Sequence, residues 1–227
     1  MKTLRALTAC VALLSLFLIP AVAQADVTLA LGGGWEAVVA DDALVSILVD
    51  QIGENYLAIE IAKDFTRPPD ASGAFPGLSI TFNQVSPNAV PYIVILDEAV
   101  TNLTGTPWTD YHMVVHGGGR AWFDVGLSSG FSMSPFSNVY WSDPGNLFGN
   151  PNRATDLSAD GGVVLPNASF FPGAGAGELV IGLDLDPVHP NYSFILEEYP
   201  TPEPGTLALL LAGLTFVARR RRNQARR

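Results

Sequence analysis

The sequence predicts an all-β protein, an antiparallel β-sandwich ectodomain flanked by an N-terminal signal helix and a short C-terminal transmembrane helix. Two observations predict the sandwich: apolar residues alternate with polar ones in many short segments, and turn-forming residues separate these segments. The alternation is clearest in three sets: Leu57, Ile59 and Ile61; Leu78, Ile80 and Phe82; and Leu179, Ile181, Leu183 and Leu185. Turn residues gather at 32–34, 68–70, 117–119 and 144–146. No segment between them has a convincing helical period.

The strands can be placed along the chain from this period of two. The predicted strands cover residues 27–31, 35–39, 44–49, 57–61, 78–82, 92–100, 111–116, 121–125, 179–185 and 192–197. Residues 128–177 alternate weakly and are rich in Gly, Pro, Ser and Asn, so we expect a long surface excursion with one or two short strands. The total comes to about nine to eleven strands.

Charge is distributed unevenly along the 227 residues. Six of the twelve basic residues lie in the last nine positions, whereas residues 26–201 hold four basic residues against 21 acidic ones, a net charge of −17. Such a domain repels phosphate backbones, which excludes a nucleic-acid partner. The one cysteine, Cys10, lies in the N-terminal apolar block, so we expect no internal disulfide in the exported domain.

The N-terminus is predicted to be a signal peptide spanning residues 1–25. Lys2 and Arg5 precede an apolar run at 9–19, and Ala23 and Ala25 supply the small side chains expected before a cleavage site. Cleavage is expected after Ala25. A buried N-terminal helix is the alternative, and it would not require this combination of features.

The C-terminus, residues 201–227, combines three parts in a fixed order. Pro202, Glu203 and Pro204 come first, a predicted transmembrane helix at 205–218 follows, and an Arg-rich tail at 219–227 ends the chain. The basic anchor consists of Arg219, Arg220, Arg221 and Arg222. Arginine resists entry into hydrocarbon, so we expect this tail to stay cytoplasmic and the domain at 26–200 to face outward. The 13 uncharged residues at 206–218 would rise only about 20 Å, which suits a weak or temporary membrane stop.

This order of parts resembles the PEP-CTERM sorting signal. The resemblance implies that exosortase, a membrane enzyme, recognises the tag, and that the protein is held at the inner membrane before it reaches the cell surface or matrix. Residues 95–112 also look like a segment of other exported proteins that carry the tag. That segment reads as a strand, a turn at 102–106 and a return strand; its expected role is architectural, with Trp108 filling core volume.

One motif suggests an enzyme. Residues 126–130 match the Gly-x-Ser-x-Gly pattern of a nucleophile elbow, with Ser128 as the nucleophile, and Asp156 and His189 follow in the chain order of a hydrolase triad. The motif requires a strand-to-helix turn, but the following residues have no helical period and include Pro135. We therefore predict no catalytic residue, and a secreted serine esterase is the least favoured hypothesis.

No metal site or cofactor is predicted. His112 and His116 would lie about 13 Å apart on one straight strand. The loop at 156–162 and the pair Asp184 and Asp186 offer oxygen ligands that calcium prefers, but solvated acids are the favoured interpretation. The glycine clusters lack the lysine and helix of a phosphate-binding loop.

Aromatic residues near loops suggest a possible carbohydrate contact, for which we select Trp108, Trp141 and Tyr140. Core packing remains the first expectation for each tryptophan. The resemblance also makes association with exopolysaccharide or biofilm plausible. The favoured hypothesis is thus a non-catalytic envelope or matrix protein with exosortase, the membrane and exopolysaccharide as partners; a carbohydrate-binding module is the alternative.

Overall fold

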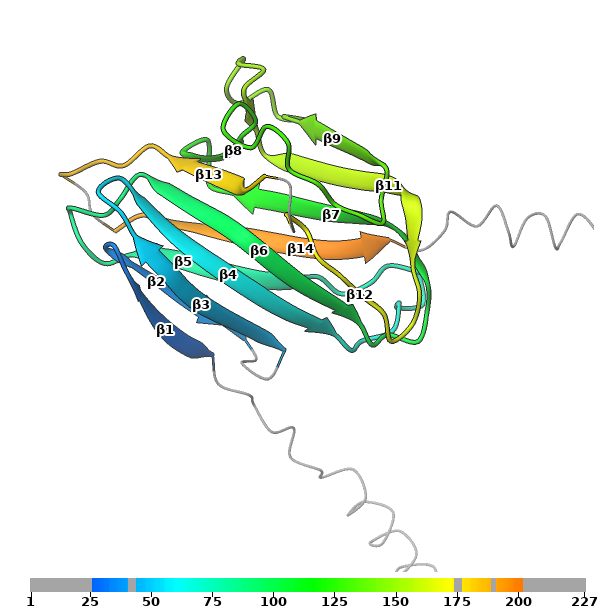
Figure 1. Cartoon of the computed structure of the whole chain (residues 1–227). Helices are drawn as coiled ribbons and strands as arrows, with labels where there is room; N and C mark the ends of the chain where they lie inside the picture. The colour runs from blue at the N-terminus through cyan, green and yellow to red at the C-terminus, as the bar shows by residue number, and fades with distance from the viewer. Residues whose placement is uncertain (1–25, 41–43, 174–176, 189–190, 202–227) are drawn as a thin grey trace, which may run out of the picture.

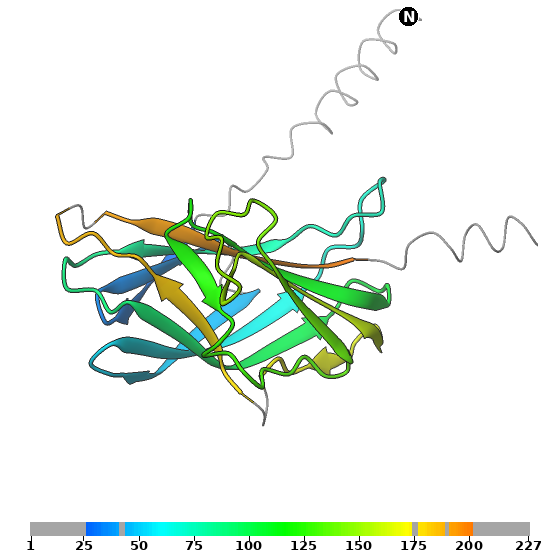
Figure 2. The ribbon, with the colours of Figure 1, turned by 90° about the horizontal axis from the view of Figure 1, so that it is seen from above.

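Two facing β-sheets form the described part of the chain, which comprises residues 26–40, 44–173, 177–188 and 191–201 of this computed structural model. This part holds fourteen strands and no helix, which confirms the predicted all-β class. Figure 1 shows the strands with their labels, and Figure 2 separates the layer of β14 from the layer of β4.

The first layer, called the β14 sheet, has β14 at its centre. Its order is β1 (Val27–Gly32), β2 (Trp35–Val39), β5 (Leu78–Gln84), β14 (Ser193–Thr201), β7 (Trp108–His116), β11 (Asp156–Val164) and β9 (Asn138–Ser142). All neighbours in this sheet are antiparallel. The last strand of the domain is therefore bonded on both sides, to β5 and to β7.

The second layer, called the β6 sheet, contains the one parallel pair among the described strands. Its order is β10 (Arg153–Ala154), β8 (Ala121–Asp124), β13 (Leu179–Leu183), β6 (Tyr92–Asn102), β4 (Tyr56–Phe65) and β3 (Val45–Ile52), and β12 (Ser169–Phe170) also pairs with β6. β4 and β6 run parallel because β5, the strand between them in sequence, crosses to the other sheet. The predicted antiparallel pairing is confirmed for the other described strand pairs, and this pair is the exception.

The core lies between the sheets, where the inward residues of each strand meet. The β14 sheet contributes Ile80, Phe82, Phe194 and Leu196, and the β6 sheet contributes Leu57, Ile59, Ile61, Ile93 and Ile95; all are almost completely buried. The rings of Phe82 and Phe194 stack at 4.9 Å on neighbouring strands. Each such side chain stabilises the fold by about 1.5–3 kcal/mol through burial, so the alternation read from the sequence is the cause of the layered fold.

All ten predicted strands are present, but residues 128–177 hold more structure than expected. Four strands lie there: β9, β10, β11 and β12. β11 buries Leu157 and Ala159 and pairs with β7 and β9 on its two sides. Near its end, Gly162 passes so close to the Pro135 carbonyl that an added Cβ would lie 2.3 Å from the oxygen. Strands of this region therefore belong to both sheets, and the prediction of a long surface excursion is wrong.

The turn between β6 and β7 connects the two sheets instead of closing a hairpin. Asn102, fully buried, donates from Nδ2 to the carbonyls of Thr106 (2.9 Å) and Val164 (3.1 Å). Its Oδ1 accepts from both the backbone N–H and the hydroxyl of Thr104. Trp108 then donates from Nε1 to the Thr104 hydroxyl at 3.3 Å. One side chain thus satisfies the polar groups of a buried chain reversal, which is the architectural role expected of this segment.

The two predicted terminal segments lie outside the described residues. Among the residues that are described, no helix has the length and apolar character needed to cross a membrane.

Replacing Asn102 tests the importance of this turn. Asn102→Ala removes four hydrogen bonds and leaves buried polar groups without partners, so we expect the free energy of unfolding to fall by about 2–4 kcal/mol. Urea unfolding measures this change. The exposed Asn55 provides the control, because Asn55→Ala should cost no more than about 0.5 kcal/mol. Equal losses for the two variants would contradict the role given to Asn102.

Candidate functional site

The predicted sorting signal, residues 201–227, begins at the last residue of the central strand β14. Thr201, the last residue of β14, donates from its backbone N–H and its hydroxyl to Oδ1 of Asp110 on β7, with an N to O distance of 2.9 Å. The predicted sorting and cleavage residues all lie outside the described part: Pro202, Glu203, Pro204, Arg219, Arg220, Arg221, Arg222, Ala23 and Ala25. The domain is thus fixed up to the residue before the Pro-Glu-Pro sequence.

Ser128 occupies a structural position. Its side chain is 2% exposed, and its hydroxyl accepts the backbone N–H of Val180 at 3.0 Å. Residues 125–130 form turns, and no helix follows them, so the geometry of a nucleophile elbow is absent from this described segment. His189 lies outside the described residues. The Ser128 hydroxyl therefore joins the turn at 125–130 to β13 through this hydrogen bond.

The histidines and acids considered as ligands lie apart. His116 contacts Glu197 (Nε2 to Oε2, 2.8 Å), while His112 stacks on Tyr199 with ring centroids 5.0 Å apart. The expected loop at 156–162 is part of strand β11, so that expectation is wrong. Within the described ranges, no group of three or more His, Cys, Asp or Glu residues is arranged to hold a metal ion.

The three aromatic residues proposed to contact carbohydrate have different environments. Trp108 is completely buried and contacts the rings of Phe65 (5.3 Å) and Phe75 (6.3 Å), so it fills core volume and cannot reach a ligand. Tyr140 is 52% exposed on the edge strand β9. Trp141, its neighbour on the same strand, is half-buried. Two of the three candidates therefore remain accessible.

A hollow beside Trp141 collects polar side chains. It has a volume of about 230 Å³ and is lined by Trp141, Asp143, Asn146, Asn150 and Arg153, among others. Arg153 is held in place because its guanidinium lies 3.8 Å from the centre of the Trp122 ring. Oδ2 of Asp143 accepts the N–H of Phe148, whereas Oδ1 is buried without a hydrogen-bond partner among the described residues. An aromatic edge with carboxylate, amide and guanidinium groups can bind hydroxyl-rich ligands.

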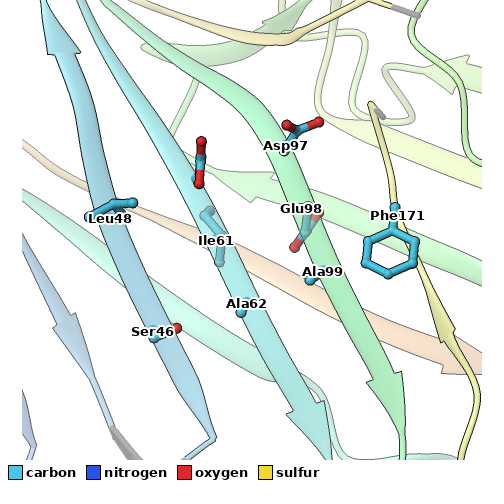
Figure 3. Close-up of a pocket in the computed structure, with 9 residues that line it drawn as sticks. Ser46, Leu48, Ile61, Ala62, Asp97, Glu98, Ala99 and Phe171 are labelled. Carbon is cyan, nitrogen blue, oxygen red and sulfur yellow. The ribbon is translucent and has the colours of Figure 1, made fainter. Parts of the chain in front are cut away.

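A second hollow, of about 400 Å³, lies on the outer face of the β6 sheet (Figure 3). Its floor consists of small residues that pair across three strands, Ser46 with Ala62 and Ala62 with Ala99. The exposed side chains of Leu48 and Phe171 stand on opposite sides. This hollow can accommodate an apolar group.

At one end of this second hollow, two carboxylates lie side by side. A register shift after Ile59 pairs Glu60 with Asp97, and this pairing places like charges on neighbouring strands. Like charges in this position are destabilising. A positively charged group next to an apolar one would therefore fit the hollow.

A cluster of ionisable residues is enclosed between the two sheets. Lys63 on β4 contacts Glu98 on β6 and Glu198 on β14 through its ammonium group, and all three side chains are at most 1% exposed. Tyr111 on β7, also buried, donates its hydroxyl to Oε2 of Glu198 at 2.7 Å. We call these four residues the Lys63 cluster. It joins the central strands of both sheets.

Burial changes the proton affinities within the Lys63 cluster. Burial, together with the nearby charge of Glu198, raises the pKa of Glu98 to about 8 despite the presence of Lys63. Burial alone would lower the pKa of Lys63, but the charges of Glu198 and Glu98 raise it above its ordinary value. Burial and these same charges raise the pKa of Tyr111 well above its ordinary range. Near neutral pH, therefore, Glu98 holds a proton and Lys63 is charged.

The sequence contained a signal for this cluster. Lys63 continues the inward series Leu57, Ile59 and Ile61, and Glu198 continues the series of Phe194 and Leu196. Extending the period of two by one step places both charges in the core. Both residues were instead counted in the surface charge of the domain, so their inward positions were not predicted.

The comparisons with known proteins identify the C-terminal signal. None of the curated protein sequences matches the chain significantly. A chain of the cyanophage Pam1 capsid asymmetric unit aligns over 60% of this chain and 91% of its own length, with 10% identity and a TM-score of 0.16. A score this low carries no argument about fold or function.

The chain thus consists of a β-sandwich domain followed by the predicted C-terminal signal. The signal itself is known: residues 200–222 match the PEP-CTERM protein-sorting motif. This chain therefore carries a PEP-CTERM protein-sorting motif at its C-terminal end.

Removing the cation should make stability depend strongly on pH. Lys63→Met leaves two buried carboxyl groups without their positive neighbour, which raises the pKa of Glu98 further. The folded state then keeps a proton that the unfolded state loses near pH 4.5, so the stabilisation is complete below that pH and is lost as the pH rises towards 8 and above. We expect the free energy of unfolding to fall by up to about 1.4 kcal/mol per pH unit in this window.

Urea unfolding at several pH values between about 5 and 8 measures this slope. The double variant Lys63→Met/Glu98→Gln is the control, because it lacks the titrating carboxyl and should give a flatter profile. Parallel profiles for the two variants would show that Glu98 does not titrate in this range.

Proposed function

We propose that this chain is an exported envelope or extracellular-matrix protein without catalytic activity, sorted by exosortase through its C-terminal signal. The observation that carries the proposal is the match of residues 200–222 to the PEP-CTERM protein-sorting motif. In this proposal the signal peptide at 1–25 directs export, and the segment at 205–218 holds the chain in the inner membrane until exosortase processes it.

Charge supports this orientation. The basic tail at 219–227 resists transfer across hydrocarbon, whereas the domain at 26–201 carries a net charge of −17 and suits the outer, hydrated side. After processing, the domain would enter the cell surface or a matrix rich in exopolysaccharide. Its lack of catalytic activity is supported by Ser128, whose hydroxyl is buried and accepts the amide of Val180.

Deleting residues 202–227 tests sorting. In a host with active exosortase, we expect the shortened chain to lose membrane retention and to be recovered in the soluble exported fraction, as measured by immunoblotting of cell fractions. Replacing Pro202, Glu203 and Pro204 by alanine is the matched control. It keeps the apolar segment and the arginines, so that chain should stay in the membrane and remain unprocessed. Unaltered fractionation of the shortened chain would refute the proposal.

Carbohydrate binding by the hollow beside Trp141 is the second candidate function. The supporting observation is that Asp143 and Arg153 line one hollow together with two asparagines and Trp141. Tyr140 precedes Trp141 on β9 and points to the opposite face of the strand, so it does not line this hollow.

Affinity electrophoresis in gels that contain the host's exopolysaccharide tests this second candidate. Asp143→Asn should weaken retardation by about tenfold in apparent Kd, which corresponds to about 1.4 kcal/mol. Phe171→Ala, which removes an exposed aromatic residue from the other hollow, is the control and should have no effect. If the unaltered protein migrates equally with and without polysaccharide, this function is wrong.

A further inference from the structure

The Lys63 cluster brings an amine and two carboxyl groups into direct contact where water is excluded. Lys63 is the one lysine of the chain besides Lys2 in the expected signal peptide, and its side chain is fully buried. Lysine is among the residues least often found fully buried. A fully buried lysine is therefore unusual in any protein, and this chain has only one lysine besides Lys2.

The two carboxyl groups are bound differently. Glu198 uses both oxygens, since Oε1 contacts Lys63 and Oε2 accepts the hydroxyl of Tyr111. Glu98 contacts Lys63 through Oε1, but its Oε2 is buried without a hydrogen-bond partner among the described residues. A buried oxygen without a hydrogen bond destabilises the folded state by about 1–3 kcal/mol. Removal of Oε2 from Glu98 would therefore stabilise the fold.

The positions of Lys63 and Glu98 in the sheet favour a short connection. On the adjacent parallel strands β4 and β6, Glu98 pairs with Ile61 and Lys63 pairs with Val100. The two side chains are therefore diagonal neighbours on the inner face of the β6 sheet, and backbone hydrogen bonds hold both strands in register.

We propose that Nζ of Lys63 and Cδ of Glu98 become joined by an amide bond, formed by the folded protein itself with the loss of one water molecule. The bond is a covalent cross-link between β4 and β6. It needs no oxidant, cofactor or other reactant.

The reaction balances with the groups present. The Lys63 ammonium passes a proton to the carboxylate of Glu198, and the neutral amine attacks Cδ of the protonated Glu98 carboxyl to form the Nζ–Cδ bond. Glu198 returns a proton to Oε2 of Glu98, the Cδ–Oε2 bond breaks, and water leaves. Nζ then gives up its second proton to Glu198, which ends as a neutral acid.

The environment supports each part of this reaction. Burial and the neighbouring Glu198 raise the pKa of Glu98 to about 8, which keeps its carboxyl neutral and open to attack by an amine at neutral pH. Glu198 acts as the catalytic residue because it touches the reacting nitrogen, and Tyr111 is the positioning residue because it holds the other Glu198 oxygen. The product leaves no charge in the core, which removes the cost of enclosing ions between the sheets.

Tryptic mapping of the full-length protein, purified and then fully denatured, tests the cross-link. Trypsin should not cut after Lys63, because an amide on Nζ removes the charge that it recognises. The bond from Arg67 to Pro68 also resists trypsin, so the expected product is one peptide that continues through Lys63 to Arg120 and is lighter by the mass of one water molecule. Cleavage after Lys63, with release of residues 64–120 at unmodified mass, would overturn the proposal.

Two variants assign the roles. Glu98→Leu keeps Lys63 but removes the acceptor carbon, so cleavage after Lys63 should return. A cross-link in this variant, with residues 154–219 attached, would move the bond to Glu198 and overturn the assignment to Glu98. Glu198→Gln should reduce linkage at least tenfold in a time course of refolded protein, while circular dichroism confirms the fold. Linkage at the unaltered rate would overturn the proton-transfer role of Glu198.

Discussion

The buried contact of Lys63 with Glu98 and Glu198 constrains this sandwich more than any other interaction described. Its members come from β4, β6 and β14, and Tyr111 of β7 completes it, so both sheets must be in register at one point for the charges to meet. Breaking a buried pair by removal of one partner costs about 3–5 kcal/mol, because an uncompensated charge remains. A slip of one residue in any of these strands would turn a charge outward and an exposed residue inward.

The apolar core around the cluster has a complementary role. Phe65 and Phe170 contact the ring of Tyr111 edge-on, at 6.0 and 5.0 Å, and they help to exclude water from the carboxyl groups. Exclusion of water explains why the pKa of Glu98 rises despite its contact with a cation. Hydrophobic packing thus drives folding without strong geometric demands, while the enclosed charges select one arrangement of the strands.

Period-two alternation predicted ten strands correctly, because most of them have one face in the core and a more exposed opposite face; β13, which is buried along its whole length, is an exception. The same alternation did not predict β11 or the parallel pairing of β4 with β6, because pairing with neighbouring strands determines both. β11 buries only Leu157 and the small Ala159 near its start, so its pattern is weak, and ladders on both sides hold it in place. The parallel pairing of β4 with β6 depends on β5 crossing to the other sheet, which no local pattern encodes.

The functional residues also divide into those that the linear sequence predicts and those whose positions depend on the fold. The sorting signal was predicted from order and charge along the chain, because a tag is read as a linear segment. Trp108 was expected first to fill core volume and was also selected, as an aromatic near a loop, for a carbohydrate contact; the turn held by Asn102 places it in the core, which confirms the first expectation. Lys63 was counted with surface charge, because the statistical preference of lysine for solvent was given more weight than its position in an alternating strand.

The central position of β14 has a mechanical consequence. Force applied at Thr201 runs along a strand hydrogen-bonded to β5 and β7 on its two sides, so rupture must shear both ladders together. Force applied at Val27 instead reaches β1, an edge strand that can peel away from β2 one bond at a time. The sandwich should therefore withstand tension from its carboxyl-terminal side far better than tension from its amino-terminal side.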